Sequence, residues 1–319
     1  MTDPDHLLDR VRERLRTPAS CGVPDIDRLV ADALRPGKLL RPDLVVRSAV
    51  AALDGGADPD VERRVVEGAL SMELLHVATL VHDDIIDASD VRRGRPSVVA
   101  SAGVATAIVI GDLLLARGVV SAAASAAGAA AVWARTLDCM AAGQLRESGL
   151  AATPSIEAHA EYASLKTAEL FRASAELGAL AAGAPAEVVE AHGTFGLHFG
   201  RAFQHVDDVL DTIGDPRRMG KPIGADAGNR VPTAASLLSE RDTLEDVAGL
   251  VATELDAARA ALAPGPRARE LGAWGAAALR RTFCAAPDEK NQDVIDRLTS
   301  AFDRLQQDPD THRTAELPS

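Results

Sequence analysis

Residues 80–87 read LVHDDIID, and residues 203–211 read FQHVDDVLD. Each stretch places aspartates at positions i, i+1 and i+4 among Val, Leu and Ile side chains. In a helix, positions i and i+4 lie one turn apart on the same face, whereas position i+1 is turned away by about 100°. We therefore expect each stretch to present three carboxylates on little more than one turn of a helix.

Carboxylates this close together in apolar surroundings raise one another's pKa unless cations compensate their charge. Mg²⁺ is the natural compensator, because it is a hard cation that binds carboxylate, water and phosphate oxygens. A single cluster could be no more than the acidic end of a helix. Two copies, each followed by a basic segment, predict a site for a diphosphate and Mg²⁺.

The chain around the two clusters also has the pattern of helices. Residues 59–88 contain one glycine and no proline beyond the first position, which suits a helix of roughly eight turns. Further helical stretches are expected over 119–149, 155–182 and 186–213.

A loop of about twenty residues, rich in glycine and proline, follows over 215–232, and loops this long in compact domains are usually functional. Two or three more helices are expected after it. The sequence has no alternating strand pattern, internal repeat or linker. We predict a single all-α domain over residues 1–319, with a frayed polar tail over 308–319.

Composition excludes several classes of protein. The chain has 319 residues, of which 47% are hydrophobic and 25% charged, as in ordinary globular proteins. Aromatic residues make up only 3% and the net charge is −13, so a nucleic-acid partner is not expected. The cysteines at positions 21, 139 and 284 are far apart and form no metal-binding or disulfide pattern, which favours a reducing cytoplasm.

No segment is expected to enter a membrane stably. The N-terminal residues are acidic and lack the apolar region of a signal peptide. The most apolar stretch, Ser97–Ala134, is interrupted by Asp112 and Arg117, and neither uncharged piece reaches the roughly 20 residues that a span requires. We expect a pair of buried core helices there, in a cytoplasmic protein.

Four basic segments suit an anionic ligand in an otherwise acidic chain. VRRGRP, at residues 91–96, begins four residues after Asp87, and GKLLRP, at residues 37–42, leads into a helix. Lys166-Thr167 lies in an apolar stretch, and GKP, at residues 220–222, lies in the long loop. Arginine binds phosphate oxygens through planar bidentate contacts, so these segments are candidate diphosphate ligands.

These motifs stand in one order along the chain: GKLLRP, then DDIID with RRGRP, then GD at residues 111–112, KT, FQHVDDVLD and GKPIGAD. The ordered set resembles the trans-isoprenyl diphosphate synthases, the polyprenyl synthetase family. The resemblance implies an antiparallel helix bundle around a deep central cavity, usually in a homodimer. It also implies a Mg²⁺-dependent reaction in which isopentenyl diphosphate adds head to tail to an allylic diphosphate by ionisation, condensation and proton elimination. The allylic substrate would be dimethylallyl, geranyl, farnesyl or geranylgeranyl diphosphate.

The resemblance implies three Mg²⁺ ions when diphosphate is bound. The expected metal ligands are carboxylates of both clusters: Asp83, Asp87, Asp207, Asp208 and Asp211. Asp84 is expected to support the first cluster. The catalytic set that the resemblance implies joins acids to polar groups beside the allylic substrate: Asp83, Asp84, Asp87, Lys166, Thr167, Gln204, Asp207 and Lys221.

The resemblance also implies which residues bind each substrate. The allylic diphosphate is expected to bind Arg92, Lys166, Gln204 and Lys221, with Thr167 and Gln204 close to the carbocation. Isopentenyl diphosphate is expected to bind Lys38, Arg41, His76 and Arg93, with Gly37 allowing close approach. His76 precedes Asp83 by two helical turns and shares its face, which supports a role in the site. His82 and His205 are expected to be packing residues.

The chain departs from the family pattern in three places. Leu39 stands where many members carry a second basic residue, which weakens the clamp on isopentenyl diphosphate. GNRVPT, at residues 228–233, replaces the usual Gly-Lys-x-Thr-Leu-Pro, with Arg230 in place of the lysine. The basic C-terminal ending of some members is absent.

Product length should follow from the depth of an apolar tunnel below the first cluster. Leu75, Ala78 and Thr79 lie eight, five and four residues before Asp83 and are expected to line one wall. None of them is a bulky aromatic residue that would stop growth early. We expect a product of about C20, geranylgeranyl diphosphate, or longer.

Three alternative functions can be compared with the motifs. A class I terpene cyclase would share the fold and the first acidic motif, but a second DDxxD stands here where a cyclase carries a different pattern. A non-catalytic subunit of a heteromeric prenyl synthase would be expected to lack an acidic or basic motif. A protein that only binds diphosphate lipids would have little need of two acidic clusters.

Overall fold

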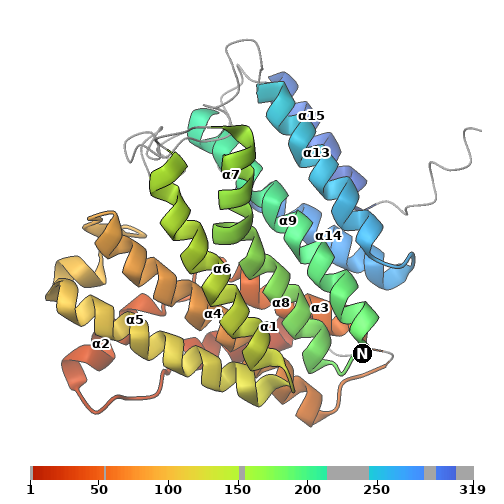
Figure 1. Cartoon of the computed structure of the whole chain (residues 1–319). Coiled ribbons are helices and arrows are strands. Elements are labelled where there is room, and N and C mark those ends of the chain that lie inside the picture. The colour runs from red at the N-terminus through yellow and green to blue at the C-terminus, as the bar shows by residue number, and fades with distance from the viewer. Residues whose placement is uncertain (1–2, 54, 151–154, 214–243, 284–291, 307–319) are drawn as a thin grey trace, which may run out of the picture. The chain divides into compact units, whose positions relative to one another are not determined.

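The computed structural model describes residues 3–53, 55–150, 155–213, 244–283 and 292–306, and Figure 1 shows them as a set of helices. The first helices are α1 (Pro4–Arg16), α2 (Pro24–Ala33), α3 (Leu40–Ala52) and α4 (Pro59–Ile86). A short hairpin of β1 (Val91–Arg92) and β2 (Arg95–Pro96) separates α4 from α5 (Val98–Ser125). The remaining helices are α6 (Ala129–Leu150), α7 (Ile156–Ala163), the π-helical turn η1 (Ser164–Ala168), α8 (Glu169–Ala181), α9 (Ala186–Ile213), α13 (Leu244–Ala261), α14 (Pro266–Phe283) and α15 (Gln292–Arg304).

The all-α fold class is confirmed, because the strands within the described ranges amount to one antiparallel hairpin. The chain groups into two compact units. The first comprises Met1–Leu137 with Ala173–Val189, and the second comprises Asp138–Arg172 with Glu190–Ser319. Each unit contains one of the two acidic clusters. The single domain expected from the sequence stays a prediction.

The residues at its N-terminus determine where helix α4 begins. The Asp58 carboxylate caps it by accepting a hydrogen bond of 2.8 Å from the Val61 amide, and Pro59 occupies the first turn, where no amide hydrogen is needed. Acidic residues in that turn interact favourably with the positive end of the helix dipole. Behind them, fully buried side chains such as Met72 and Leu75 anchor the helix in the first unit, where it packs on α1, α3 and α5.

The end of α4 is a Schellman motif, which fixes where the first acidic cluster lies. Ala88 adopts a left-handed conformation with φ +49°. The Ser89 amide donates to the Asp84 carbonyl at 2.9 Å, and the Ala88 amide donates to the Ile85 carbonyl at 3.3 Å. The hairpin then turns at Arg93 and Gly94, both with positive φ, so that β1 and β2 follow α4 at once.

Helix α5 differs from the expected pair of buried core helices. Its two helical segments meet at a kink at Gly103, where φ is +78°, and α6 begins only after Gly128, whose φ is also positive. Ile110 and Leu114 are buried, but several other apolar side chains are exposed, including Val109 at 65% and Val120 at 68%. Among the described residues, α4 and α5 are long and apolar enough to cross a membrane; the most apolar window of α4 is 72% buried, but that of α5 only 28%.

The core of the second unit gathers many of the chain's few aromatic residues. Phe199 on α9 lies at 5.3 Å from Phe171 and 5.2 Å from Trp274, measured between ring centroids. Gly200 allows this packing, since an added Cβ would lie 2.7 Å from the Ala168 Cα. Helix α9 is therefore held closely against the η1–α8 segment, which matters for the site because η1 carries Lys166 and Thr167.

Close packing of α8 on α3 in the first unit gives a test of the fold. A Cβ on Gly178 would lie 2.2 Å from the Val45 carbonyl oxygen and 2.7 Å from the Ser48 Cβ. Gly178→Ala should therefore lower the free energy of unfolding by about 1–3 kcal/mol or more, measured by urea denaturation. The control is Gly249→Ala on α13, where a Cβ meets open space and should stabilise by about 1 kcal/mol. Equal stability of Gly178→Ala and wild type would contradict the packing described.

Candidate functional site

The first Asp cluster, formed by Asp83, Asp84 and Asp87, occupies the C-terminal end of α4. Negative side chains are unfavourable there, because the carbonyl end of the helix dipole is itself negative. The cluster therefore does not serve helix stability. It is an arrangement that requires positive charge from elsewhere.

Part of that charge comes from the hairpin. Arg92 on β1 donates from Nε at 2.8 Å and from Nη2 at 2.5 Å to Asp84 Oδ1, and Asp84 is only 2% exposed. A buried carboxylate is stable only when paired, so this contact fixes the hairpin to α4. The sequence predicted Arg92 as a ligand of the allylic diphosphate. The structure gives it a carboxylate partner within the first unit, and its role toward substrate stays a prediction.

The residues expected to bind isopentenyl diphosphate form a positive group in the same unit. Burial, reinforced by the charges of Arg41, Arg93 and Arg92, holds the pKa of His76 well below the usual value near 6.5. His76 is therefore neutral at pH 7. A Cβ on Gly37 would lie 3.0 Å from the Arg93 Cζ, so this glycine leaves room for the Arg93 guanidinium. Lys38 is exposed immediately before α3.

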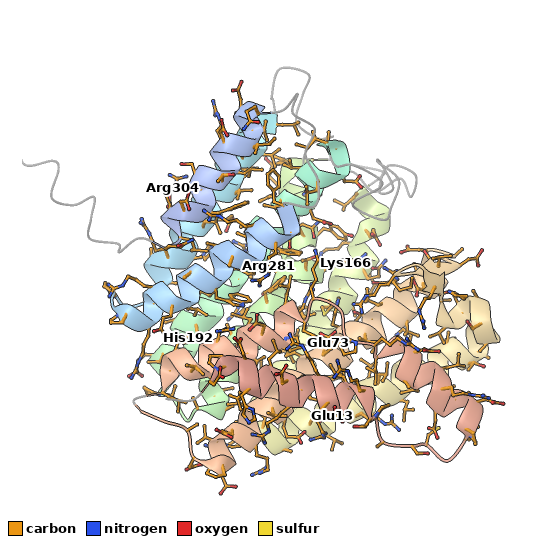
Figure 2. All side chains as sticks on the ribbon, turned by 180° about the vertical axis from the view of Figure 1, so that it is seen from behind. Glu13, Glu73, Lys166, His192, Arg281 and Arg304 are labelled. Atoms are coloured by element: carbon orange, nitrogen blue, oxygen red, sulfur yellow. The ribbon has the colours of Figure 1, made fainter. Side chains whose placement is uncertain are left out.

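Two features of this group were not foreseen from the sequence. Glu73, labelled in Figure 2, is buried: burial raises its pKa, while the charges of Arg41 and Arg93 oppose the shift. Its position one turn before His76 was the available signal. Leu39, read as a missing basic residue, is instead a core residue, 3% exposed and held at φ +52°. Its weakening of the clamp stays a prediction.

A pocket of about 590 Å³ lies beside the hairpin in the first unit. Its polar lining includes Asp84 and four arginines: Arg35, Arg92, Arg93 and Arg95. Its apolar lining comes from α2, α4 and the start of α5. Some of the arginine charge is compensated, because Arg95 and Arg35 both contact Asp32.

The expected tunnel residues lie on the inner part of α4. Leu75 and Ala78 are fully buried, and Thr79 is half-buried with its hydroxyl donating to the His76 carbonyl at 2.9 Å. His82 rests directly against α5, since a Cβ on Gly111 would lie 2.0 Å from its Nε2. This contact accounts for the glycine of the GD motif and agrees with the packing role expected for His82.

The second Asp cluster, formed by Asp207, Asp208 and Asp211, lies near the end of α9. Asp208 and Asp211 are buried. Gln204 donates from Nε2 to Asp208 Oδ1 at 3.0 Å, and Thr167 donates from its hydroxyl to Gln204 Oε1 at 2.9 Å. The structure thus brings Thr167 and Gln204 together with Asp208, while their roles toward the allylic substrate stay predictions.

Lys166, labelled in Figure 2, lies on the π-helical turn η1, an irregularity often found at functional sites. Its Nζ is 3.0 Å from Glu147 Oε1 and lies 5.4 Å from the centroid of the Tyr162 ring. The Tyr162 hydroxyl donates to the same oxygen at 2.7 Å. Gly143 permits this arrangement, because a Cβ there would lie 2.8 Å from the Lys166 backbone nitrogen.

Glu147 and Tyr162 were not identified from the sequence, although Tyr162 lies one turn before Lys166. Lys221, Arg230 and the segment 228–233 fall outside the described residues, as does the tail over 308–319. Within the described ranges, no three His, Cys, Asp or Glu side chains converge into a preformed metal cage. The donor chemistry nevertheless fits Mg²⁺, which takes one or two carboxylates and completes its shell with water and phosphate oxygens.

A model of the polyprenyl synthetase family matches residues 24–252. The chain belongs to this family. The resemblance drawn from the motifs is confirmed, and the match covers both Asp clusters and every basic segment named above.

Individual relatives agree with the family assignment. A (2E,6E)-farnesyl diphosphate synthase of Mycobacterium bovis is 40% identical over 204 residues, which are 62% of this chain and only 55% of that protein. A heptaprenyl diphosphate synthase component 2 of Geobacillus stearothermophilus is 34% identical over 84% of this chain and 76% of its own length. The crystal structure of a Caulobacter crescentus polyprenyl synthase, complexed with calcium and isoprenyl diphosphate, is 26% identical, with a TM-score of 0.64 over 95% of both chains.

The neutral state of His76 makes stability depend on pH. Its pKa is lower in the folded protein than in the unfolded chain, so acid favours unfolding, and the stability it contributes is lost as pH falls below about 6.5. His76→Gln should reduce this loss by up to about 1.4 kcal/mol for each pH unit between 6.5 and 5. The measurement is urea denaturation at several pH values.

The control for that experiment is His6→Gln, at an exposed position on α1. It should leave the pH dependence of unfolding as in wild type. An unchanged pH dependence in His76→Gln would show that burial and the neighbouring arginines do not hold His76 neutral.

Proposed function

We propose that this chain is a metal-dependent trans-prenyl diphosphate synthase that adds isopentenyl diphosphate head to tail to an allylic diphosphate. The observation that carries the proposal is the pair of helix-borne Asp clusters, each accompanied in its own unit by cations suited to a diphosphate. Arg92 and Arg93 accompany the first cluster, and Lys166 accompanies the second. Membership of the polyprenyl synthetase family supports the same chemistry.

The proposed cofactor is Mg²⁺, with three ions when diphosphate is bound. Asp83, Asp87, Asp207, Asp208 and Asp211 would hold the ions together with diphosphate oxygens. Bound there, the metal supplies positive charge to the departing diphosphate. Ionisation of the allylic substrate separates charge, so groups already in place around the leaving diphosphate stabilise the transition state more than the ground state.

One group of residues would bind the allylic substrate. Lys166, Lys221 and Arg92 would bind the allylic diphosphate as it leaves. The hydroxyl of Thr167 and the amide of Gln204 are fixed by their mutual hydrogen bond and would place their dipoles near the carbocation. Lys166 contacts Glu147 at 3.0 Å and would exchange this contact for an oxygen of the bound diphosphate.

The second substrate would be held by the basic group in the first unit. Arg41, Arg93 and Lys38 would bind the diphosphate of isopentenyl diphosphate. His76, being neutral, can donate one hydrogen bond without adding charge. Gly37 would leave space for close approach. The attacking double bond then forms the new carbon–carbon bond, and a proton leaves to restore neutrality.

We further propose that both units belong to one synthase domain, with a product of about C20 or longer. Leu75 and Ala78 are buried on α4 and carry no aromatic ring that would block growth. The two relatives described above are named as a farnesyl and a heptaprenyl diphosphate synthase, so the tunnel residues carry this part of the proposal. The cytoplasmic location stays a prediction.

The chain length of the product can be measured directly. The purified protein would be incubated with Mg²⁺, isopentenyl diphosphate and, separately, dimethylallyl, geranyl, farnesyl or geranylgeranyl diphosphate. We expect products that end at C20 or beyond, and Asp83→Ala and Asp207→Ala should each lower kcat by about 100-fold or more. Asp9→Ala, at an exposed position on α1, should retain full activity.

Other outcomes would correct specific parts of the account. Products that end at C15 would preserve the reaction and contradict the tunnel argument. Pyrophosphate release without consumption of isopentenyl diphosphate would indicate a cyclase. Activity that appears only with a second, different chain would favour a heteromeric synthase, a candidate raised by the relative named component 2 of a heptaprenyl synthase.

A second copy of the chain is proposed to cover α5. Val104, Ile108, Val109 and Val120 are exposed apolar residues on this helix, and a homodimer interface would bury them. Val109→Glu should convert a dimer into monomers, as measured by sedimentation velocity. Val23→Glu, which places the same charge at an exposed apolar position before α2, should leave the dimer intact. A wild-type monomer would contradict this interface.

A further inference from the structure

A buried histidine on α7 lies against the second Asp cluster. His159 is 2% exposed, and its Nε2 is 3.4 Å from Asp208 Oδ2, in a carboxylate that is also 2% exposed. His159 belongs to none of the sequence motifs, so no role was expected for it. Its contact arises only when α7 and α9 pack together within the second unit.

His159 and Gln204 occupy opposite oxygens of the same carboxylate. Gln204 donates from Nε2 to Oδ1 at 3.0 Å, while His159 approaches Oδ2. A carboxylate withdrawn from water needs such neighbours, since an uncompensated buried charge costs several kcal/mol. In the first cluster, the second aspartate likewise meets a side chain from another element, because Arg92 pairs with Asp84. In both clusters the second aspartate is thus held by the protein.

The contact extends beyond Asp208. Gln204 donates to Asp208, so its amide oxygen is directed to the Thr167 hydroxyl, which donates to it at 2.9 Å. Asp208 therefore sets the orientation of the Gln204 amide, and the amide sets the Thr167 hydroxyl. This series joins α7, α9 and η1. It connects His159 to the two residues expected beside the carbocation.

We propose that His159 is a positioning residue: its Nε2–H holds Asp208, and through Asp208 it orients Gln204 and Thr167 and keeps the second Asp cluster arranged for metal and diphosphate. The inference rests on the proposed function of that cluster. The unpartnered Nδ1 of His159 agrees with a proton on Nε2, because Nε2 is the nitrogen that faces the carboxylate. His159 itself touches neither substrate nor metal in this account.

The geometry allows a test with two variants of nearly equal polarity. In His159→Gln, the side-chain amide nitrogen can occupy the position of Nε2. In His159→Asn, the amide nitrogen lies near the position of Nδ1, and the shorter side chain cannot reach Asp208. Matched controls are His192→Gln and His192→Asn. His192 is a second buried histidine of this unit, on α9 and outside the series described (Figure 2).

The first readout is binding rather than turnover. Mn²⁺ would be titrated in the presence of inorganic pyrophosphate and followed by electron paramagnetic resonance. We expect His159→Gln to bind within about threefold of wild type and His159→Asn to bind at least tenfold more weakly. The two His192 variants should bind Mn²⁺ with the same affinity as one another. Equal binding by the two His159 variants would overturn the proposal.

The second readout is kinetic. His159→Asn should lower kcat and raise the KM for geranyl diphosphate, but leave the KM for isopentenyl diphosphate unchanged, because the residues proposed for that substrate lie on α3, α4 and the hairpin. A general loss of structure would raise both KM values equally, and that result would contradict a positioning role. If wild type makes no prenyl product while pyrophosphate binding still follows the expected order, the proposed function fails and the positioning role stands.

Wild-type protein gives a test that needs no variant to fold. Nitrogen-15 chemical shifts of labelled histidine distinguish the two neutral tautomers, and the His159 signals are assigned as those missing in His159→Gln. A proton on Nε2 supports the proposal. A bare Nε2 with a proton on Nδ1 would overturn it, because His159 could then donate nothing to Asp208.

Discussion

Carboxylates withdrawn from water are the constraint on which the other features of this protein depend. Each Asp cluster contains an aspartate that is 2% exposed, Asp84 in one and Asp208 in the other. A buried charge without partners costs several kcal/mol, so neighbouring elements must provide cations or hydrogen-bond donors. The hairpin after α4 supplies Arg92 to Asp84, and α9 supplies the Gln204 amide to Asp208, whose other oxygen lies 3.4 Å from His159 Nε2 on α7. The remaining need for positive charge is what a metal–diphosphate complex would meet.

Irregular backbone appears where these charges are arranged. Ala88, in a left-handed conformation, ends α4. Arg93 and Gly94, both with positive φ, form the turn of the hairpin, and Arg92 just before this turn contacts Asp84. The π-helical turn η1 presents Lys166 and Thr167, and Gly143 lets α6 approach it. Such conformations are strained or rare, and regular helices on both sides hold them in place.

Local pattern was sufficient to predict the helices and the two clusters, because each depends on residues only a few positions apart. Asp83 and Asp207 follow from spacing, and the end of α4 near Asp87 follows from the basic turn after it. Partners that come from distant elements could not be predicted. Glu147 beside Lys166 and His159 beside Asp208 depend on how helices pack, and periodicity within one helix does not carry that information. The exposure of α5 was not predicted for a related reason. The apolar sequence of a helix is the same whether the helix packs inside its own chain or against a second copy.

We propose above that aspartates of the two clusters hold a diphosphate through metal ions. A crystal structure with Mg²⁺ and an unreactive allylic thiodiphosphate tests it most directly. We predict that the diphosphate is bound through ions coordinated by Asp83 and Asp87 and also by Asp207, with Lys166 moved from Glu147 to a phosphate oxygen. A diphosphate bound beside one cluster alone, or bound without metal, would contradict the account.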